Sequence, residues 1–383
     1  MKSKKYLLTF VAVLLLATNM LYATSREDGK TKSFKVSKGG KLNVDLMAGG
    51  INIQTWDKDE VLISVEGLSD NAFKNLETEV KGNELFVKFE NDEDDTENDV
   101  TFTFTVPTKF NLDLKTMGGD VSLKNNVDGS VAIDTYGGEI SSKNIIGSAK
   151  VETKGGDINL DEIAGDCDVN TFGGDISIGS ISGKNVKVST NGGDIKIKKS
   201  TAGINAKTYG GDVRVGDLGG DSELVTYGGD ISVGYAVGNL TMESSGGNLE
   251  LNGAKGEIKA KTSGGDITFK KVEGSVDLKT QTGMIAVELN PSSNRESKIT
   301  TNMGSIELTL PSSANVTVDA RIHVQGGWKY AIDEYKIHSD FDSQSYSLED
   351  KTRDIVGVYK INNGSGKIYL KSVNDEIKIK KGL

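Results

Sequence analysis

Aspartate recurs directly after a Gly-Gly pair in this chain of 383 residues. It stands at positions 120, 157, 175, 194, 212, 230 and 266, with Glu139 and Asn248 in equivalent places. Carboxylates stacked about 4.8 Å apart repel by roughly 1 kcal/mol per pair in water, so such a row needs a compensating interaction. Hydrogen bonds from the amides of each aspartate's own glycine turn are the simplest compensation.

Calcium bound between successive aspartates is a second way to hold such a row. The spacing of about 18 residues also suits calcium-binding nonapeptide rolls, whose pattern is Gly-Gly-x-Gly-x-Asp-x-apolar-x. Here the aspartate follows Gly-Gly directly and occurs once per repeat, so the match is weak. The weak calcium candidates are Asp157, Asp175, Asp194, Asp212 and Asp230; no other cofactor is indicated.

Aromatic side chains are the second group that could bind a ligand. Tyr209 and Tyr227 both precede a Gly-Gly pair and would stack in consecutive repeats, forming a patch for a surface glycan or a protein partner. The alternative is that these two rings have a structural role only and cover the neighbouring turns. Trp328 and Tyr330 lie in a later, non-repeating stretch and complete the set of candidate binding residues.

Catalytic patterns are weak, and we predict no catalytic residue. His323 and His338 are the only histidines, and no Ser or Cys motif beside them suggests a nucleophile. Cys167 falls at an apolar position of the repeat, which favours a small core residue over a reactive thiol. A glycosidase would need a local pair of acids, for which Asp333 and Glu334 are the candidates.

The elements that position these residues follow from the repeat. Before each Gly-Gly pair, and again after the aspartate, apolar residues recur at every second position, as in Val131/Ile133 and Ile176/Ile178. Alternation with period two indicates strands with one buried face. A third apolar site, such as Ile163, precedes another glycine in most repeats. Each repeat of about 18 residues is therefore predicted to be one coil of an all-β fold, a parallel β-solenoid.

Two residue types are predicted to build the turn of each coil. Paired glycines would supply positive φ angles and a narrow edge. The threonine before them shares the parity of the buried residues and would point inward, where its hydroxyl bonds other threonines or the turn amides. These threonines are Thr135, Thr153, Thr171, Thr190, Thr208, Thr226, Thr262 and Thr280.

The pattern divides the chain into five parts. Residues 1–23, with three lysines before an apolar run and Ala23 at the end, are predicted to be a cleaved secretory signal peptide. Residues 24–110 form an N-terminal β region that caps the first coil, and residues 111–310 the solenoid. Residues 311–360 are a non-repeating insertion or cap, and residues 361–383 a final coil.

Composition narrows the function classes. Loss of the three leader lysines would change the formal net charge from −10 to −13, which argues against nucleic-acid binding. A single cysteine cannot form an internal disulfide. No apolar run after the leader approaches the roughly 20 residues that cross a bilayer, so no transmembrane segment is predicted after cleavage. Residence in the periplasm, the cell envelope or on the outer surface follows as the expectation.

The Gly-Gly-Asp-Ile coils, the segment Gly49-Gly50-Ile51-Asn52-Ile53, the Val106-Pro107 step and the strand Gly366–Leu370 together resemble a bacterial family of adhesin-like proteins. The likeness spans about residues 30–383. It implies a β-strand-repeat domain of unknown function in exported proteins and offers no catalytic pattern. We therefore expect a non-enzymatic, adhesin-like or scaffolding binding protein. The alternatives are a polysaccharide-active β-helix enzyme and a calcium-stabilised extracellular repeat protein.

Overall fold

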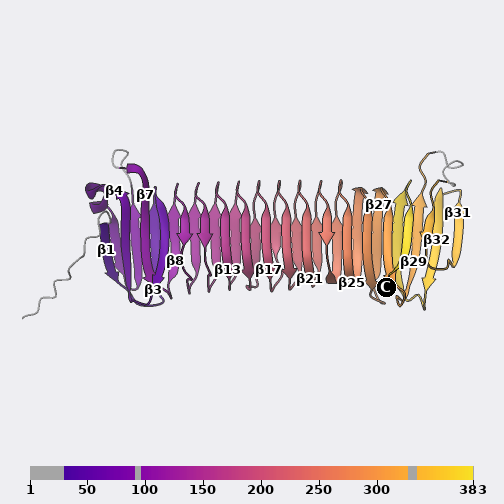
Figure 1. The fold of residues 1–383 in the computed structure, drawn as a ribbon, viewed down its shortest axis with the longest axis horizontal. Helices are drawn as coiled ribbons and strands as arrows, with labels where there is room; N and C mark the ends of the chain where they lie inside the picture. Colours follow the sequence, from indigo (N-terminus) through magenta and orange to yellow (C-terminus); the bar gives the residue numbers. More distant parts are fainter. Residues whose placement is uncertain (1–29, 91–95, 327–333, 383) are drawn as a thin grey trace, which may run out of the picture.

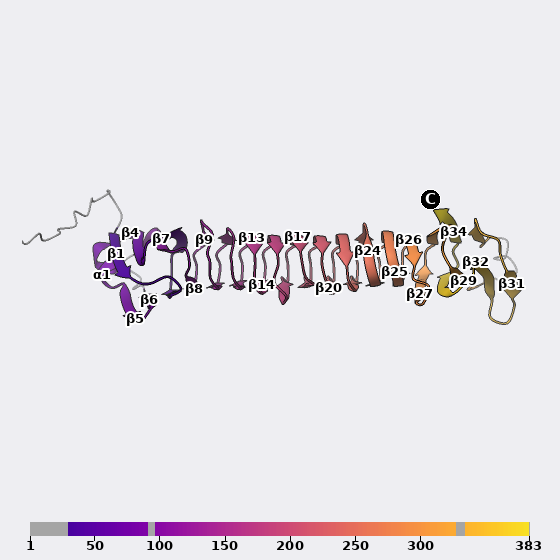
Figure 2. The same ribbon diagram turned by 90° about the horizontal axis from the view of Figure 1, so that it is seen from below.

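Two parallel sheets lie back to back along a rod, as the computed structural model shows from two sides (Figures 1 and 2). The structure describes residues 30–90, 96–326 and 334–382. Each coil contributes one strand to the first sheet, here called face A, and the next strand to the second sheet, face B. The predicted all-β solenoid is confirmed.

Strands of face A pair in a spatial order that differs from chain order only near the ends. The order is β5 (Glu77–Lys81), β6 (Glu84–Phe89), β2 (Lys41–Leu46), β8 (Asn111–Thr116), β10 (Val131–Thr135), β12 (Ala149–Thr153), β14 (Cys167–Thr171), β16 (Val186–Ser189), β18 (Asn205–Lys207), β20 (Ser222–Val225), β22 (Leu240–Glu243), β24 (Ala254–Lys261), β25 (Ile267–Thr282), β27 (Glu296–Met303), β33 (Gly366–Val373), β29 (Val316–His323), β32 (Asp354–Ile361) and β31 (Ser345–Glu349).

Face B is built in the same way, and the long strand β25 contributes to both faces. Its order is β1 (Lys30–Lys35), β4 (Glu60–Leu68), β7 (Thr96–Pro107), β3 (Gly50–Trp56), β9 (Val121–Leu123), β11 (Ile140–Ser142), β13 (Ile158–Ile163), β15 (Ile176–Ile181), β17 (Ile195–Ser200), β19 (Val213–Leu218), β21 (Ile231–Val237), β23 (Leu249–Leu251), β25, β26 (Ile285–Pro291), β28 (Ile306–Pro311), β34 (Ile377–Gly382) and β30 (Ile337–Ser339).

The core lies between the two faces and is built from the residues that the alternation marked. Val131, Ile133, Ile176 and Ile178 are each at most 2% exposed, whereas Ala132 and Ser177 between them are partly exposed. Burial of a Val or Ile side chain contributes about 1.5–3 kcal/mol, and each coil repeats it. The third apolar site is also confirmed, because Ile163 is 1% exposed and bridges to the coil before it.

Glycine serves the turn for a different reason from the predicted one. None of the paired glycines between 118 and 265 has a positive φ. A Cβ on the second glycine of a pair would instead meet the preceding coil: on Gly138 it would lie 2.0 Å from the carbonyl oxygen of Gly119. Close stacking of the coils therefore requires glycine at the second position.

At both ends of the rod, strands that are distant in sequence lie next to each other. β2 and β3 lie between β6 and β7 on one side and β8 and β9 on the other, although β2 and β8 are about 70 residues apart. At the far end β33 and β34 stack on β27 and β28, and the strands of the 311–360 region lie outside them. The last coil in sequence is thus not the last coil in space (Figure 1).

Antiparallel strands finish each end. β1, β4 and β7 pair antiparallel at the N-terminal end, and β29, β32 and β31 at the C-terminal end. The short helix α1 (Asp70–Lys74) follows β4, and the Ser69 side chain accepts a hydrogen bond from the amide of Ala72 at its start. Within residues 30–90, 96–326 and 334–382, no helix has the length and apolar character needed to cross a membrane.

Candidate functional site

One long corner of the rod carries most of the predicted site residues. We call it the glycine edge: the turn from face A to face B in each coil, with the sequence Thr-x-Gly-Gly-Asp or a close variant. The x residue and the aspartate flank the two glycines on opposite sides. The aspartates and their equivalents form the acidic row. The rings among the x residues form the aromatic row, and the x residues are Met117, Tyr136, Lys154, Phe172, Asn191, Tyr209, Tyr227, Ser245 and Ser263.

Inward threonines hold the glycine edge in place. Thr208 Oγ1 donates a hydrogen bond of 2.9 Å to the carbonyl of Gly193 in the preceding coil and accepts one of 3.3 Å from the amide of Gly211 in its own turn. The other predicted threonines each donate to a glycine carbonyl of the preceding coil. The prediction of inward threonines that bond the turn amides is confirmed; the carbonyl of the preceding coil is an added partner.

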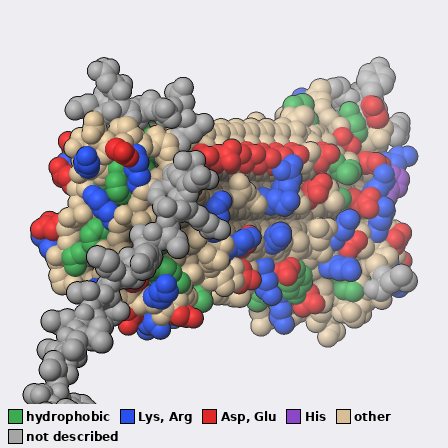
Figure 3. All heavy atoms as spheres, turned by 60° about the vertical axis from the view of Figure 1, so that its left-hand side comes forward, with side chains coloured by type: hydrophobic (Ala, Val, Ile, Leu, Met, Phe, Trp, Pro, Cys, Tyr) green, Lys and Arg blue, Asp and Glu red, His purple; other side chains and the backbone are tan. Residues whose placement is uncertain are grey.

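The acidic row is held by bonds between coils. Asp175 Oδ1 accepts a hydrogen bond of 2.7 Å from the amide of Asp194, its counterpart in the next coil. The same contact, at 2.6–2.8 Å, follows Asp157, Asp194, Asp212 and Asp230. The compensating amide therefore belongs to the next coil, whereas the sequence predicted amides of the aspartate's own turn. Figure 3 shows carboxylates as a continuous row below a ridge of backbone and small side chains.

Arg214 adds a cation to the middle of the acidic row. Its guanidinium bonds Asp194 at 3.0 Å and also bonds Asp212. The hydrogen bond to Asp194 raises the pKa of Arg214. The side chain bridges two coils and reduces the repulsion between the carboxylates there.

Calcium coordination at the acidic row stays a prediction. Each candidate aspartate uses one carboxylate oxygen for the amide of the next coil. Over the described parts of the chain, no group of three or more His, Cys, Asp or Glu side chains converges as a metal site would require. A calcium ion there would have to draw on pairs of carboxylates and on water.

Tyr209 and Tyr227 stack as expected from their spacing. Their ring centroids lie 5.0 Å apart with an angle of 4° between the planes, and each side chain is about half exposed. The Lys207 ammonium lies 4.9 Å from the Tyr209 centroid and 5.6 Å from the Tyr227 centroid. The negative face of an aromatic ring attracts a cation at these distances. The pair is thus an exposed aromatic surface that already accepts an ammonium group.

The aromatic row continues toward the N-terminal end. Tyr136 is 66%, Phe172 63% and Met117 59% exposed, and each takes the same place in its coil as Tyr209. None of these three residues was among the binding residues predicted from the sequence. Their outward direction follows from parity, because the threonine before them points inward.

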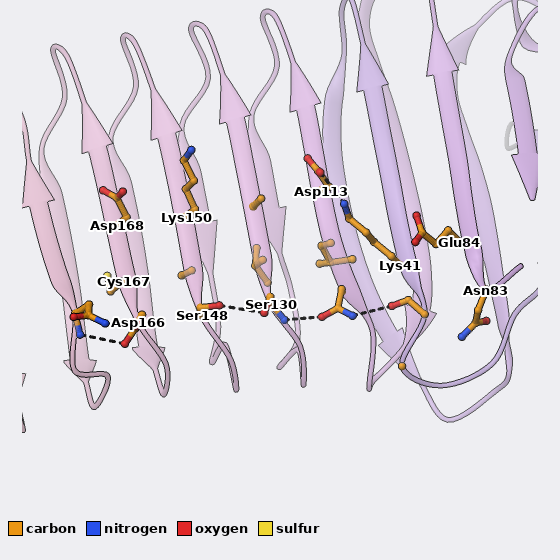
Figure 4. Close-up of a pocket in the computed structure, with 18 of the residues that line it drawn as sticks. Lys41, Asn83, Glu84, Asp113, Ser130, Ser148, Lys150, Asp166, Cys167 and Asp168 are labelled. Carbon is orange, nitrogen blue, oxygen red and sulfur yellow. Dashed lines mark hydrogen bonds and ion pairs between the residues drawn. The ribbon is translucent and has the colours of Figure 1, made fainter. Parts of the chain in front are cut away.

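A groove on face A was not predicted. It has a volume of about 770 Å³ and runs across the starts of β2, β8, β10, β12 and β14, with the β5–β6 turn at one end (Figure 4). Lys41 pairs with Asp113 at 2.9 Å, and Lys150 stands beside Asp168 on the neighbouring strand. Charges of both signs line it, and its lining residues include no aromatic ring.

The family model for Toastrack DUF4097 matches residues 40–236 and again residues 201–380, which together cover most of the chain. The chain belongs to the Toastrack family. The family's description as a domain of unknown function assigns no activity, and no curated protein matches the chain.

Solved structures similar to this Toastrack chain come from several bacteria. A "putative adhesin" from Bacteroides fragilis is 18% identical over 74% of this chain and 97% of its own, with a TM-score of 0.23. A "putative adhesin" from Parabacteroides merdae is 14% identical over 74% of this chain and 97% of its own, with a TM-score of 0.30. A "putative lipid binding protein" from Parabacteroides distasonis is 14% identical over 74% and 97%, with a TM-score of 0.24.

The remaining predicted residues belong to the C-terminal part of the Toastrack sequence. Trp328, Tyr330 and Asp333 lie outside the described residues, and Glu334 is exposed. His323 Nδ1 lies 2.8 Å from an Asp354 carboxylate oxygen across the β29–β32 pair.

The other two residues noted for their chemistry lie far apart. His338 stands on β30 with its Nε2 4.0 Å from Glu376. Cys167 is buried, and burial together with the Asp168 charge raises the pKa of its thiol to about 12. A thiol with that pKa stays protonated near neutral pH, as a core residue would.

Proposed function

We propose that this Toastrack protein is a non-enzymatic binding protein, exported to the bacterial cell envelope, with an adhesin-like or scaffolding role. The aromatic row of the glycine edge carries the proposal, with the Tyr209–Tyr227 stack as its centre. The partner is a surface glycan or a protein.

Rigidity and exposure together make this edge suited to binding. Large rings that are half to two-thirds exposed leave apolar area in water, which burial against a partner would remove. The threonine and aspartate bonds that join successive coils fix the backbone beneath the rings. A preordered surface loses little conformational entropy on binding.

Cell fractionation combined with protease accessibility tests the location. We expect the mature chain outside the cytoplasm after removal of residues 1–23. An uncleaved chain that stays in the cytoplasm would contradict the export part of the proposal.

Retention of envelope material tests the binding edge. Purified protein is compared with the double variant Tyr209→Ser/Tyr227→Ser and with a control, Tyr235→Ser/Tyr369→Ser, which removes two exposed tyrosines away from the edge. We expect the edge variant to lose retention and the control to keep it. Equal retention by all three proteins would refute the role of the aromatic row.

A further inference from the structure

In the four coils from Gly118 to Gly173, the two glycines of a pair have different steric surroundings. In later coils a Cβ would be tight even on the first glycine, for example 3.2 Å from a carbonyl oxygen at Gly192 and 3.1 Å at Gly210. A Cβ on the second glycine would collide with the preceding coil, as at Gly156, where it would lie 2.1 Å from the carbonyl oxygen of Gly138. A Cβ on the first glycine meets nothing within 4 Å at Gly118 and Gly137, and nothing closer than 3.7 Å at Gly155.

Backbone conformation does not require the first glycine either. Gly118, Gly137, Gly155 and Gly173 all lack a positive φ, and the nearest atom to a Cβ on Gly173 would be 3.6 Å away. Alanine at a position whose conformation it can adopt normally stabilises a protein by reducing the entropy of the unfolded chain. These four consecutive coils nevertheless carry glycine, which leaves a strip of backbone without side chains. Close approach of a ligand to the backbone is a use of glycine that fits this strip.

Both borders of the strip can bind a ligand. On one side stand the exposed rings of Tyr136 and Phe172, and Lys154, in the coil between them, is paired with Glu152 at 2.9 Å. On the other stand the carboxylates of Asp120, Glu139 and Asp157. A hollow of about 700 Å³ opens at the N-terminal end of the strip, lined by Gly118, Gly119, Asp120 and Glu139 among others.

The charge of the two borders indicates the charge of a partner that would bind there. The acidic row presents a carboxylate in most coils, about 4.8 Å apart, and the whole chain has a formal net charge of −10. Lys207 shows that rings of the aromatic row accept an ammonium group. Carboxylates and ring faces both favour a cation, and a negatively charged partner would be repelled.

We propose that the glycine edge from Met117 to Tyr227 binds an extended, lysine-rich segment of a partner protein. Its backbone lies along the bare strip, and its ammonium groups contact the carboxylates and rings at the borders. The inference rests on the proposed function and specifies its partner as cationic.

A fluorescent oligolysine peptide is the probe, and its Kd for the mature chain is measured by anisotropy at fixed salt. Gly137→Leu/Gly155→Leu fills the strip at two positions where a Cβ has room, and its melting temperature shows whether it folds. Asp157→Asn/Asp175→Asn removes two charges and keeps an acceptor for the amide of the next coil, as Asn248 does naturally. Asp217→Asn/Asp277→Asn removes two exposed charges away from the glycine edge and is the control.

Both edge variants are expected to weaken binding by about tenfold or more, and the control by less than about twofold. Equal weakening by the edge and control charge variants would show general attraction to an acidic protein and overturn the proposal. So would full affinity of a folded Gly137→Leu/Gly155→Leu variant. Binding of a neutral oligosaccharide at the edge in place of oligolysine would overturn the cationic partner and leave the proposed binding function standing.

Discussion

Thr208 combines two roles in one side chain, since its methyl group shares the inward parity of the core and its hydroxyl joins two coils. Replacement by valine keeps the volume and removes both hydrogen bonds, to the carbonyl of Gly193 and from the amide of Gly211. We expect a loss of about 1–3 kcal/mol in the free energy of unfolding, measured with urea.

Serine is the matched control at this position. Ser244 makes both of the same contacts in its own coil, to Gly229 and from Gly247. Thr208→Ser should therefore lose less stability than Thr208→Val. A valine variant as stable as the serine variant would show that the hydroxyl contributes nothing.

Cys167 gives the molecule an alkaline pH dependence. Burial and the Asp168 charge raise the pKa of its thiol from 9.0 to about 12. The folded chain keeps this proton where the unfolded chain has lost it, so the contribution to stability is complete below pH 9 and falls as the pH rises toward 12. We expect wild type to lose more unfolding free energy than Cys167→Ala between about pH 8 and about pH 10.5. Parallel losses in the two proteins would contradict this.

At the residue scale, parity made the inward threonines and the stacked tyrosines predictable, because a strand places alternate residues on opposite sides. Lys207 over the rings was not predictable, since its long side chain has many rotamers. Arg214 was missed for the same reason.

At the scale of elements, the coils between 111 and 310 could be predicted because each strand pairs with the strand about 18 residues away. The ends could not, because their pairings are long-range: Lys41 pairs with Asn111, and Glu296 with Lys367. Nothing in the local pattern specifies such partners. The face A groove was missed with them, because its end wall depends on the pairing of β6 with β2.

The placement of β33 between β27 and β29 leads to a prediction for one strand. Ile368 is 1% exposed there, so Ile368→Asp buries a charge and should cost about 3 kcal/mol or more. Because solenoid coils contact only their neighbours, hydrogen exchange should rise in β27 and β29 and stay slow in β15 and β17. Tyr369→Asp, at an exposed site of the same strand, should leave exchange unchanged. Uniform loss of protection along the rod would contradict the local effect.

At the scale of the whole molecule, the acidic row raises the question of calcium. Amide bonds between coils and the Arg214 bridge already oppose the repulsion of the carboxylates. We therefore expect the melting temperature to be the same in excess chelator and in added calcium. A lower melting temperature in chelator would favour the calcium-stabilised alternative. If Asp194→Asn/Asp230→Asn no longer showed this decrease, the ion would be bound at the acidic row.

The central claim is that the rod binds its partner through the glycine edge. Site-specific photo-crosslinking in intact cells tests it most directly, with the photoreactive residue at Tyr136 or, as a control, at the exposed Tyr235 on another side of the rod. We predict a discrete crosslinked envelope product from position 136 and none from position 235. No product from position 136, or the same product from both positions, would contradict the account.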